Sequence, residues 1–281
     1  MISSTFLLIA GSLLAATSNA VSVKRAVTPL PANGKWDYQI GGPYTPDSNV
    51  AVVTRDRTST PVSGKYNICY INAFQSQPDQ ASHDFWLNDP TRNNLILKNS
   101  AGQPYEDEDW PGEYYFDTRT ADKRQALANI VNGWIDECKQ KGFNAIEPDN
   151  LDTFTRSDNL LSENNNLDYA KLLADHAHAA GVELAFGQKN AGGELEGRGK
   201  ARVGFDFAIA EECQAFEECE SYTDVYGNQV LEVEYVDPEA PNNGRGNFTA
   251  ACTARGSQIS VIFRDVLVVP RGSSGYVYEE C

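Results

Sequence analysis

Eight short apolar runs that alternate with helical patterns predict an α/β protein, a single-domain (β/α)8 TIM barrel. Alternation at this spacing implies parallel pairing of the strands, and residues 26–281 match the roughly 250 residues of such a barrel. The predicted strands cover residues 36–40, 50–54, 66–72, 143–146, 182–186, 205–210, 230–236 and 260–263.

The chain begins with the features of a secretory signal peptide. In residues 1–20, an apolar core too short to span a bilayer is followed by small residues at the cleavage positions. A short pro-segment, residues 21–25, ends in the dibasic pair Lys24-Arg25, so the mature chain is expected to start at Ala26. Since there is no other long apolar run, we expect a secreted, extracellular protein that does not enter a membrane.

Two segments outside the predicted strands are irregular in sequence. Residues 26–34 are rich in proline and are expected to form a loosely structured N-terminal arm. Residues 74–118 are polar and aromatic, and a structureless insertion of that length is uncommon, so part of it should be a helix or a lid. Its acidic run, residues 106–109, is expected to be a solvated loop.

Two helices are clearly indicated between the strands. Apolar residues recur at three- and four-residue spacing from Leu127 to Cys138, and Gly142 is expected to end that helix. The same pattern runs from Tyr169 to Ala180, before Gly181. Helices after the second strand, near Asp56, and around Tyr226 are only weakly indicated.

Polar side chains gather at the predicted carboxyl ends of several strands, where α/β proteins place their chemistry. The run at residues 143–146 ends in Glu147, Pro148 and Asp149, and Pro148 is expected to interrupt the hydrogen-bonded ladder. Aspartate and asparagine there are also ordinary turn residues. A carboxylate inside a strand, however, needs a partner or a function. The strand-end set is Asp149, Asp152, Lys189, Asn190, Glu211, Glu212, Glu234 and Tyr235.

This set argues against metal and cofactor chemistry. His83, His176 and His178 are the chain's histidines, and they are too few and too scattered for a zinc or histidine-based site. No phosphate-binding or dinucleotide-binding glycine pattern is present. We therefore expect no metal and no cofactor. Paired carboxylates flanked by aromatic residues are what glycoside hydrolysis requires, although a sugar-binding barrel without turnover would present the same features.

Charge and cysteine content fit an exported protein with a cationic partner. The formal net charge of −16 repels nucleic acid and anionic lipid and would attract a cationic substrate, or it simply keeps the protein soluble. Six cysteines in an exported chain indicate disulfides, and six cysteines allow fifteen connectivities. The set that sequence position suggests among these is Cys213–Cys219, Cys252–Cys281 and Cys69–Cys138. The sequon at Asn247 is expected to lie in an exposed loop.

Several ordered motifs resemble glycoside hydrolase family 114, a family of secreted barrel enzymes whose described activity is endo-α-1,4-polygalactosaminidase. The most specific are Glu-Pro-Asp-Asn at residues 147–150 and Glu-x-Cys at residues 211–213. Further matching segments are residues 142–152, 167–170, 177–179, 188–190, 205–213, 218–219 and 233–235. The resemblance implies a hydrolase of α-1,4-linked galactosamine polymers, with a cationic polysaccharide as substrate. We expect the protein to be a monomer. A glycosidase on another α-linked glycan is the alternative.

The resemblance also implies roles for individual residues. It assigns Asp149 and Glu211 as the catalytic pair, and the flanking Phe205-Asp-Phe and Cys213 favour Glu211 over Glu212. By analogy with barrel enzymes acting on α-galactosides, Asp149 would be the nucleophile and Glu211 the acid/base of a retaining reaction. Carboxyl groups about 5 to 5.5 Å apart would fit retention, and about 6.5 to 9.5 Å would fit inversion. The residues expected to bind substrate are Glu147, Asp152, Lys189, Asn190, Glu234, Tyr235, Trp36 and Tyr70.

Overall fold

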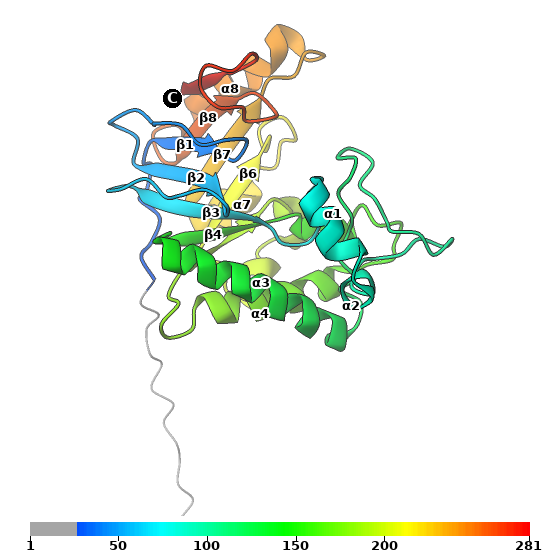
Figure 1. Cartoon of the computed structure of the whole chain (residues 1–281). Helices are drawn as coiled ribbons and strands as arrows, with labels where there is room; N and C mark the ends of the chain where they lie inside the picture. The colour runs from blue at the N-terminus through cyan, green and yellow to red at the C-terminus, as the bar shows by residue number, and fades with distance from the viewer. Residues whose placement is uncertain (1–26) are drawn as a thin grey trace, which may run out of the picture.

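Strands that follow one another in the sequence also lie next to one another in the sheet (Figure 1). The structure is a computed structural model that describes residues 27–281, so the predicted signal peptide and pro-segment lie outside the described residues. Within this part of the chain, the strands are β1 (Trp36–Gln39), β2 (Val52–Asp56), β3 (Tyr66–Asn72), β4 (Ala145–Asp149), β5 (Ala185–Lys189), β6 (Phe207–Glu211), β7 (Val230–Tyr235), β8 (Ser260–Arg264) and β9 (Tyr278–Glu280).

Strands β1 to β8 pair in parallel, each with the next, as the alternating pattern predicts. Their inward residues form one apolar cluster inside the barrel, which includes Trp36, Ile68, Leu231 and Ile262. A larger cluster fills the space between the sheet and the surrounding helices. The prediction of an α/β TIM-type barrel is therefore confirmed.

The ninth strand was not predicted, because Tyr-Glu-Glu at residues 278–280 carries no apolar alternation. It pairs antiparallel with β8 and lies where a closed barrel would join β8 to β1. No ladder connects β8 and β1 directly. Side chains bridge the seam instead: the Ser260 hydroxyl donates to Gly34 O, the Tyr278 hydroxyl to Trp36 O, and the Arg264 guanidinium to Tyr38 O.

Local signals explain where the two long helices begin and end. In α3 (Ala121–Lys141), the Thr120 side chain caps the first turn, and Gly142 ends the helix with a φ of 95°, a left-handed conformation that glycine adopts at no steric cost. In α4 (Glu163–Ala177), Ser162 and Asn165 form a reciprocal capping box. The end of α3 is as predicted, whereas α4 stops before the expected Ala180. The two helices lie side by side against the sheet (Figure 1).

The shorter helical elements sit on the connections between strands. They are α1 (Gln80–Leu87), α2 (Pro90–Asn93), η1 (Leu151–Phe154), α5 (Gly192–Leu195), α6 (Arg198–Val203), α7 (Glu220–Tyr226), η2 (Pro241–Gly244) and α8 (Arg245–Arg255). Helix α7 confirms the weak pattern around Tyr226, and α1 and α2 confirm helix within residues 74–118. The connection after β2 contains no helix, so the expectation near Asp56 is wrong.

Other local expectations are corrected. Strand β4 continues through Pro148 to Asp149 in register with β3, although its ladder with β5 covers only Ala145 and Ile146. Strands β5 and β6 begin and end later than predicted, so Lys189 and Glu211 are strand residues. Within the acidic run at residues 106–109, Asp107 is buried and bound to Gln75, so that run is not simply solvated.

Three disulfides join the predicted partners: Cys69–Cys138, Cys213–Cys219 and Cys252–Cys281. The described part of the N-terminal arm is irregular but packed, because Leu30 is buried in the barrel cluster and Thr28 O accepts a hydrogen bond from Tyr66. Asn247 lies in α8 and not in a loop. No helix in residues 27–281 combines the length and apolar character that a membrane span needs.

Candidate active site

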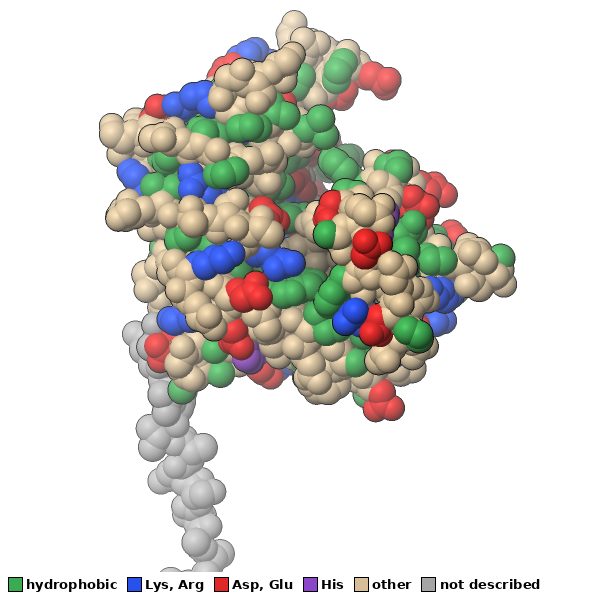
Figure 2. Space-filling view, in the orientation of Figure 1, with side chains coloured by type: hydrophobic (Ala, Val, Ile, Leu, Met, Phe, Trp, Pro, Cys, Tyr) green, Lys and Arg blue, Asp and Glu red, His purple; other side chains and the backbone are tan. Residues whose placement is uncertain are grey.

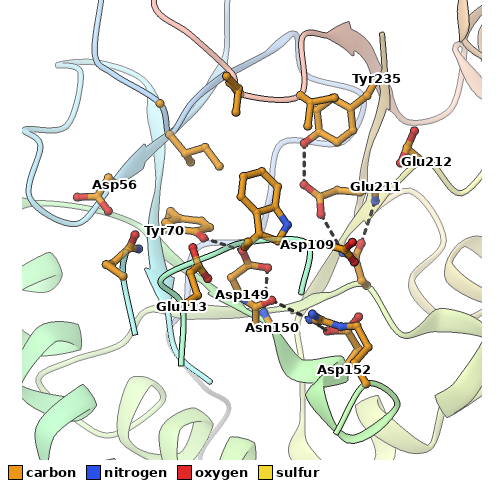
Figure 3. A pocket seen from close by; sticks show the side chains of 18 of the residues that line it. Asp56, Tyr70, Asp109, Glu113, Asp149, Asn150, Asp152, Glu211, Glu212 and Tyr235 are labelled. Carbon is orange, nitrogen blue, oxygen red and sulfur yellow. Dashed lines mark hydrogen bonds and ion pairs between the residues drawn. The ribbon is translucent and has the colours of Figure 1, made fainter. Parts of the chain in front are cut away.

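A pocket of about 450 Å³ opens at the carboxyl ends of the barrel strands. Figure 2 shows the surface hollowed between the barrel and the lobe that contains α1 and α2. Figure 3 shows the side chains that converge on it. Its lining includes carboxylates from several strand ends and loops, with Arg156 as the basic residue among them; the acidic residues are Asp56, Asp109, Glu113, Asp149, Asp152, Glu211 and Glu212.

Asp149 is the last residue of β4 and points into this pocket. The Tyr70 hydroxyl donates to its Oδ2 at 2.6 Å, and the Asn150 backbone N–H donates to Oδ1 at 2.9 Å. Burial raises the pKa of the Asp149 carboxyl; Lys189 opposes the rise and the charge of Glu211 adds to it. Asp149 is therefore the member of the pair that holds a proton more readily in the ligand-free site.

Glu211 ends β6 and lies in a different electrostatic environment. Its Oε1 accepts from the Tyr235 hydroxyl at 2.6 Å and lies 2.8 Å from the Lys189 ammonium, while Oε2 accepts from Asn190 Nδ2 at 2.8 Å. Burial alone would raise the pKa of the Glu211 carboxyl, but Lys189 and these hydrogen bonds hold it below its usual value. The lowered pKa favours the ionised form of Glu211, and the 24% exposure of its side chain leaves it reachable from the pocket.

A fully buried polar layer lies beneath the pair. Lys189 Nζ donates to Glu147 Oε1 at 2.9 Å and to the Tyr38 hydroxyl at 2.8 Å, and that hydroxyl donates to Glu147 Oε1 at 2.7 Å. The other oxygen of Glu147, Oε2, is buried without a hydrogen-bond partner. Three negative neighbours, Glu147, Glu211 and Asp149, together outweigh the effect of burial and raise the pKa of Lys189, so its ammonium is the fixed positive charge under the pocket.

The backbone turns in the same way after three successive strands. Asn150, Asn190 and Glu212 follow the last residues of β4, β5 and β6, and all three adopt positive φ, at 68°, 52° and 55°. Asparagine tolerates this conformation, but a glutamate there is strained by about 1–2 kcal/mol. The turns send the side chains of Asp149 and Glu211 into the pocket.

The structure brings most of the predicted site residues to one place. Tyr70, Asp149, Asp152, Asn190, Glu211 and Tyr235 all line the pocket. Glu212 also lines it, but Glu211 alone of the two contacts Lys189, Tyr235 and Asn190. Asp152 is ion-paired with Arg156 at 3.0 Å, so part of its charge is already neutralised.

Four predicted substrate contacts lie outside the pocket lining. Glu147 and Lys189 are buried one layer below it, and Trp36 lies in the barrel interior, where its indole N–H donates to Thr54. Glu234 is 1% exposed and accepts a hydrogen bond from Gln214 N at 2.9 Å, so it holds the β6–α7 loop. None of these four side chains faces the space that a substrate would fill, so direct contact with substrate is not supported by their positions.

Sequence reasoning missed several lining residues. Glu113, Asp109, Trp110 and Arg156 reach the pocket from irregular loops, and Phe216 reaches it from the disulfide-closed loop after β6. The sequence signal for Asp109, Trp110 and Glu113 was the concentration of acidic and aromatic residues at 106–115, which has no periodicity and so could not be placed. Large hydrophobic side chains that stay exposed within residues 27–281 are Trp110, Phe216, Val266 and Leu267, and all four line this pocket.

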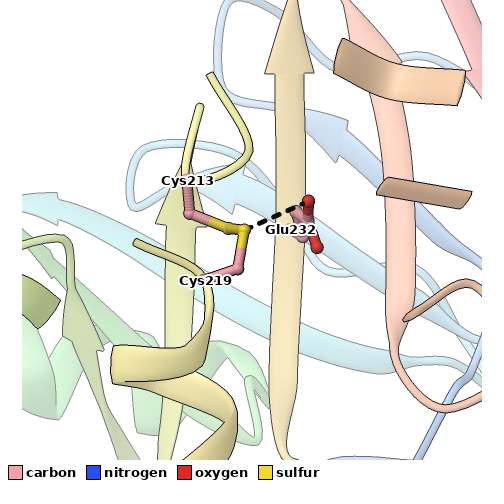
Figure 4. Close-up of side chains that lie close together, drawn as sticks. All are labelled: Cys213, Cys219 and Glu232. Atoms are coloured by element: carbon pink, nitrogen blue, oxygen red, sulfur yellow. Dashed lines mark hydrogen bonds between the residues drawn. A yellow bond between two sulfur atoms is a disulfide. The ribbon is translucent and has the colours of Figure 1, made fainter. Parts of the chain in front are cut away.

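One group of potential metal ligands occurs within residues 27–281, and it does not form a metal site. Cys213 and Cys219 are joined in a disulfide, so their sulfurs are not thiolates, and Glu232 lies 3.6 Å from Cys219 Sγ (Figure 4). The Arg255 guanidinium binds both oxygens of Glu232 at 2.9 and 2.7 Å. These contacts anchor α8 and the β6–α7 loop to β7.

A parallel barrel with two carboxylates at the ends of β4 and β6, in an open acidic pocket edged by exposed aromatic side chains, defines the class of barrel glycoside hydrolases. The family comparison agrees, because the model of glycoside-hydrolase family GH114 matches residues 16–281. The chain belongs to glycoside-hydrolase family GH114. No curated protein sequence matches it.

Two solved structures share the fold over nearly their whole length. Ega3 of Aspergillus fumigatus, solved in complex with galactosamine, matches with a TM-score of 0.68 and 21% identity over 91% of this chain and 98% of that one. The glycoside hydrolase domain of PelA from Pseudomonas aeruginosa matches with a TM-score of 0.54 and 13% identity over 85% and 97%. At these identities the similarity establishes the fold.

Proposed function

We propose that this chain is a secreted, monomeric, endo-acting glycoside hydrolase that cleaves α-1,4-linked galactosamine polymers. The observation that carries the proposal is the convergence of Asp149 and Glu211 on one pocket whose charge is unbalanced. Five carboxylates of the pocket form no ion pair with any residue in 27–281: Asp56, Asp109, Glu113, Asp149 and Glu212. A polymer with ammonium groups would supply the missing positive charge.

Two further features support the substrate class. Ega3, which shares the fold, binds galactosamine in its solved complex. The exposed rings of Trp110 and Phe216 offer flat apolar surfaces of the kind on which sugar rings stack. An open pocket with such residues on its rim suits internal cleavage of a long chain.

In the proposed reaction, Asp149 attacks the anomeric carbon while Glu211 protonates the leaving oxygen. Water then hydrolyses the glycosyl ester with Glu211 as the base, which retains the anomeric configuration. The ligand-free site has the opposite charge pattern, because the pKa of Asp149 is raised and that of Glu211 is lowered. The first step therefore requires the pair's proton to move from Asp149 to Glu211 when a cationic sugar binds beside Asp149.

The first test of the function is incubation of the purified protein with partly deacetylated galactosaminogalactan, followed by mass spectrometry of the soluble products. We expect a range of galactosamine oligomers early in the reaction from wild type and none from Asp149→Asn. Release by neither protein, with polymer binding intact, would instead support a sugar-binding barrel. Release from an α-linked glycan without amines only would support a different glycosidase.

Azide rescue separates the two roles. With Asp149→Gly, azide in place of the nucleophile should yield the β-galactosaminyl azide, and with Glu211→Ala, azide should attack the glycosyl-enzyme and yield the α-azide. If the two variants gave the opposite products, Glu211 would be the nucleophile and Asp149 the acid/base. A β-configured first product from wild type, observed by proton NMR, would show inversion and contradict the proposed mechanism.

Secretion and oligomeric state have separate tests. Intact mass of protein from the culture medium should correspond to a chain beginning at Ala26, and light scattering should give the mass of one chain. A retained Met1 would contradict the proposed processing.

A further inference from the structure

We propose that Glu113 is a specificity-determining residue that binds the ammonium group of the sugar attacked by Asp149. This inference rests on the proposed function, because it takes Asp149 as the group that reacts at the anomeric carbon. It adds a recognition site for the free amine to the catalytic pair. The chemistry recognised is a primary ammonium on the carbon next to the anomeric carbon.

Glu113 comes from the loop before α3 and faces the pocket beside Asp149 and Tyr70 (Figure 3). Only 9% of the residue is exposed. Its Oε2 accepts from Asn72 Nδ2 at 2.7 Å, and Asn72 Oδ1 accepts in turn from Asn150 Nδ2 at 2.9 Å. The carboxylate is thus fixed by a short chain of hydrogen bonds to the residue that follows Asp149.

The other oxygen of Glu113 is available. Among the described residues, Oε1 accepts no hydrogen bond and forms no ion pair, yet Glu113 lines the cavity. Burial raises the pKa of Glu113 to about 7, Asn72 opposes the rise, and the nearby charge of Asp149 adds to it. Arg156 is near enough to oppose the rise as well but forms no ion pair with Glu113. A buried carboxylate with a free oxygen and no ion-pair partner gains more from a bound cation than an exposed carboxylate does.

The two basic side chains near the pocket already form ion pairs with other carboxylates. Arg156 pairs with Asp107 and Asp152, and Lys189 pairs with Glu147 and Glu211. Glu113 therefore lacks a positive partner within residues 27–281 until a ligand brings one.

The position of Glu113 fits the chemistry of a 2-amino sugar. The amine is on the carbon next to the anomeric carbon, so a group that binds it must lie beside the carboxyl that attacks that carbon. Glu113 is placed this way relative to Asp149. An acetamido group is neutral and larger, so it would leave the carboxylate unpaired and would crowd the buried oxygen.

The same contact would prepare the reaction. An ammonium group between Glu113 and Asp149 favours the ionised form of both carboxyls, and the proton of the catalytic pair is then left to Glu211. The same ammonium contact would therefore both select the free amine and set the protonation states that the first step needs.

The test compares one polymer in two forms, fully de-N-acetylated galactosaminogalactan and the same preparation after chemical re-N-acetylation. Glu113→Gln keeps an oxygen for Asn72 and removes only the charge. We expect kcat/KM on the deacetylated polymer to fall at least about tenfold, with little change on the acetylated polymer, so the preference for free amines falls by the same factor.

Asp109→Asn is the matched control, because it removes one carboxylate of the same loop and pocket at an exposed position. It should lower both rates by similar small factors that vanish at high salt. Equal effects of the two substitutions would reduce Glu113 to a contributor of general charge and overturn the inference.

Three further results have definite meanings. Equal losses on both polymers with Glu113→Gln would make it a general catalytic support, again against the inference. Thermal melting shows whether the variant is folded; if it is not, Glu113→Asp, which keeps the charge but shortens its reach, should still prefer free amines. If wild type cleaves neither polymer, it is the proposed function that fails.

Discussion

Lys189 places an ammonium group in the barrel interior with only 1% of its side chain exposed. Between Glu147 below and Glu211 above, it has two roles that mutation can separate. It lowers the pKa of Glu211, and it neutralises Glu147, which is fully buried. A buried charge left without its partner costs about 3–5 kcal/mol, whereas replacing both members of a pair costs far less.

Lys189→Met should therefore change both pH dependence and stability. Without the cation, only the hydrogen bonds from Tyr235 and Asn190 oppose the effect of burial, so the pKa of Glu211 rises. Since Glu211 must be protonated for the first step, the basic limb of kcat/KM should move to higher pH. The free energy of unfolding should fall by about 3–5 kcal/mol at neutral pH. A pH–rate profile and urea denaturation measure the two effects.

The double variant Glu147→Gln with Lys189→Met is the control for stability. It should recover most of the lost free energy while leaving the shifted pH profile in place. A shift of the acidic limb in place of the basic one would show that Glu211 works in its ionised form, which would contradict its role as the acid.

At the scale of single elements, strand positions were predictable because buried parallel strands are apolar runs with fixed length. The sequence could not show how far below the pocket each inward-facing side chain lies in the barrel. Glu147 and Asp149 both point into the barrel because they are two residues apart on β4, but they lie in successive layers, and only the upper one reaches the pocket. For this reason the sequence placed Glu147 and Lys189 among the pocket residues, whereas both lie one layer below the lining.

Site residues on loops could not be predicted from the sequence either. Glu113 and Trp110 belong to a connection whose residues are fixed by contacts distant in sequence, such as Asn72 with Glu113 and Arg156 with Asp107. Neither periodicity nor spacing encodes such contacts. The predicted catalytic pair needed no loop prediction, because both members end strands.

The β6–α7 loop gives a prediction about pH. Burial raises the pKa of Glu234 to about 7, and the hydrogen bond from Gln214 N opposes the rise. The folded state therefore keeps this proton more readily than the unfolded chain does. Its contribution to stability is complete below about pH 4.5 and is lost as pH rises through about 7. The loss amounts to at most about 3 kcal/mol.

Glu234→Gln should remove that dependence, since the amide oxygen still accepts from Gln214 N and cannot ionise. Urea denaturation from pH 4.5 to 8 should show a flatter curve for the variant than for wild type. Glu239→Gln, at an exposed site in the connection after β7, should keep the wild-type curve. Identical curves for all three proteins would show that Glu234 does not titrate in this range.

At the scale of the whole molecule, the barrel has a seam between β8 and β1 that no parallel ladder closes. Strand β9 covers it, and its chain end is attached to α8 by the Cys252–Cys281 disulfide. Lys35 pairs with Glu280 across the seam, and Tyr278 donates to Trp36 O at 2.8 Å. The last four residues thus act on the first strand of the barrel.

Truncation after Val277 should consequently destabilise the whole molecule. It removes the disulfide, worth about 3–4 kcal/mol for a loop of this length, together with the β9 ladder and the contacts to β1. The double variant Cys252→Ser and Cys281→Ser removes the disulfide alone and should lose clearly less free energy of unfolding.

Because Tyr38 of β1 donates to Glu147 beneath the catalytic pair, we also expect the truncated protein to lose polymer cleavage well below its melting temperature, whereas the double serine variant stays active. Equal stability and equal activity of the two variants would mean that the disulfide alone accounts for the tail, and that the seam closes without β9.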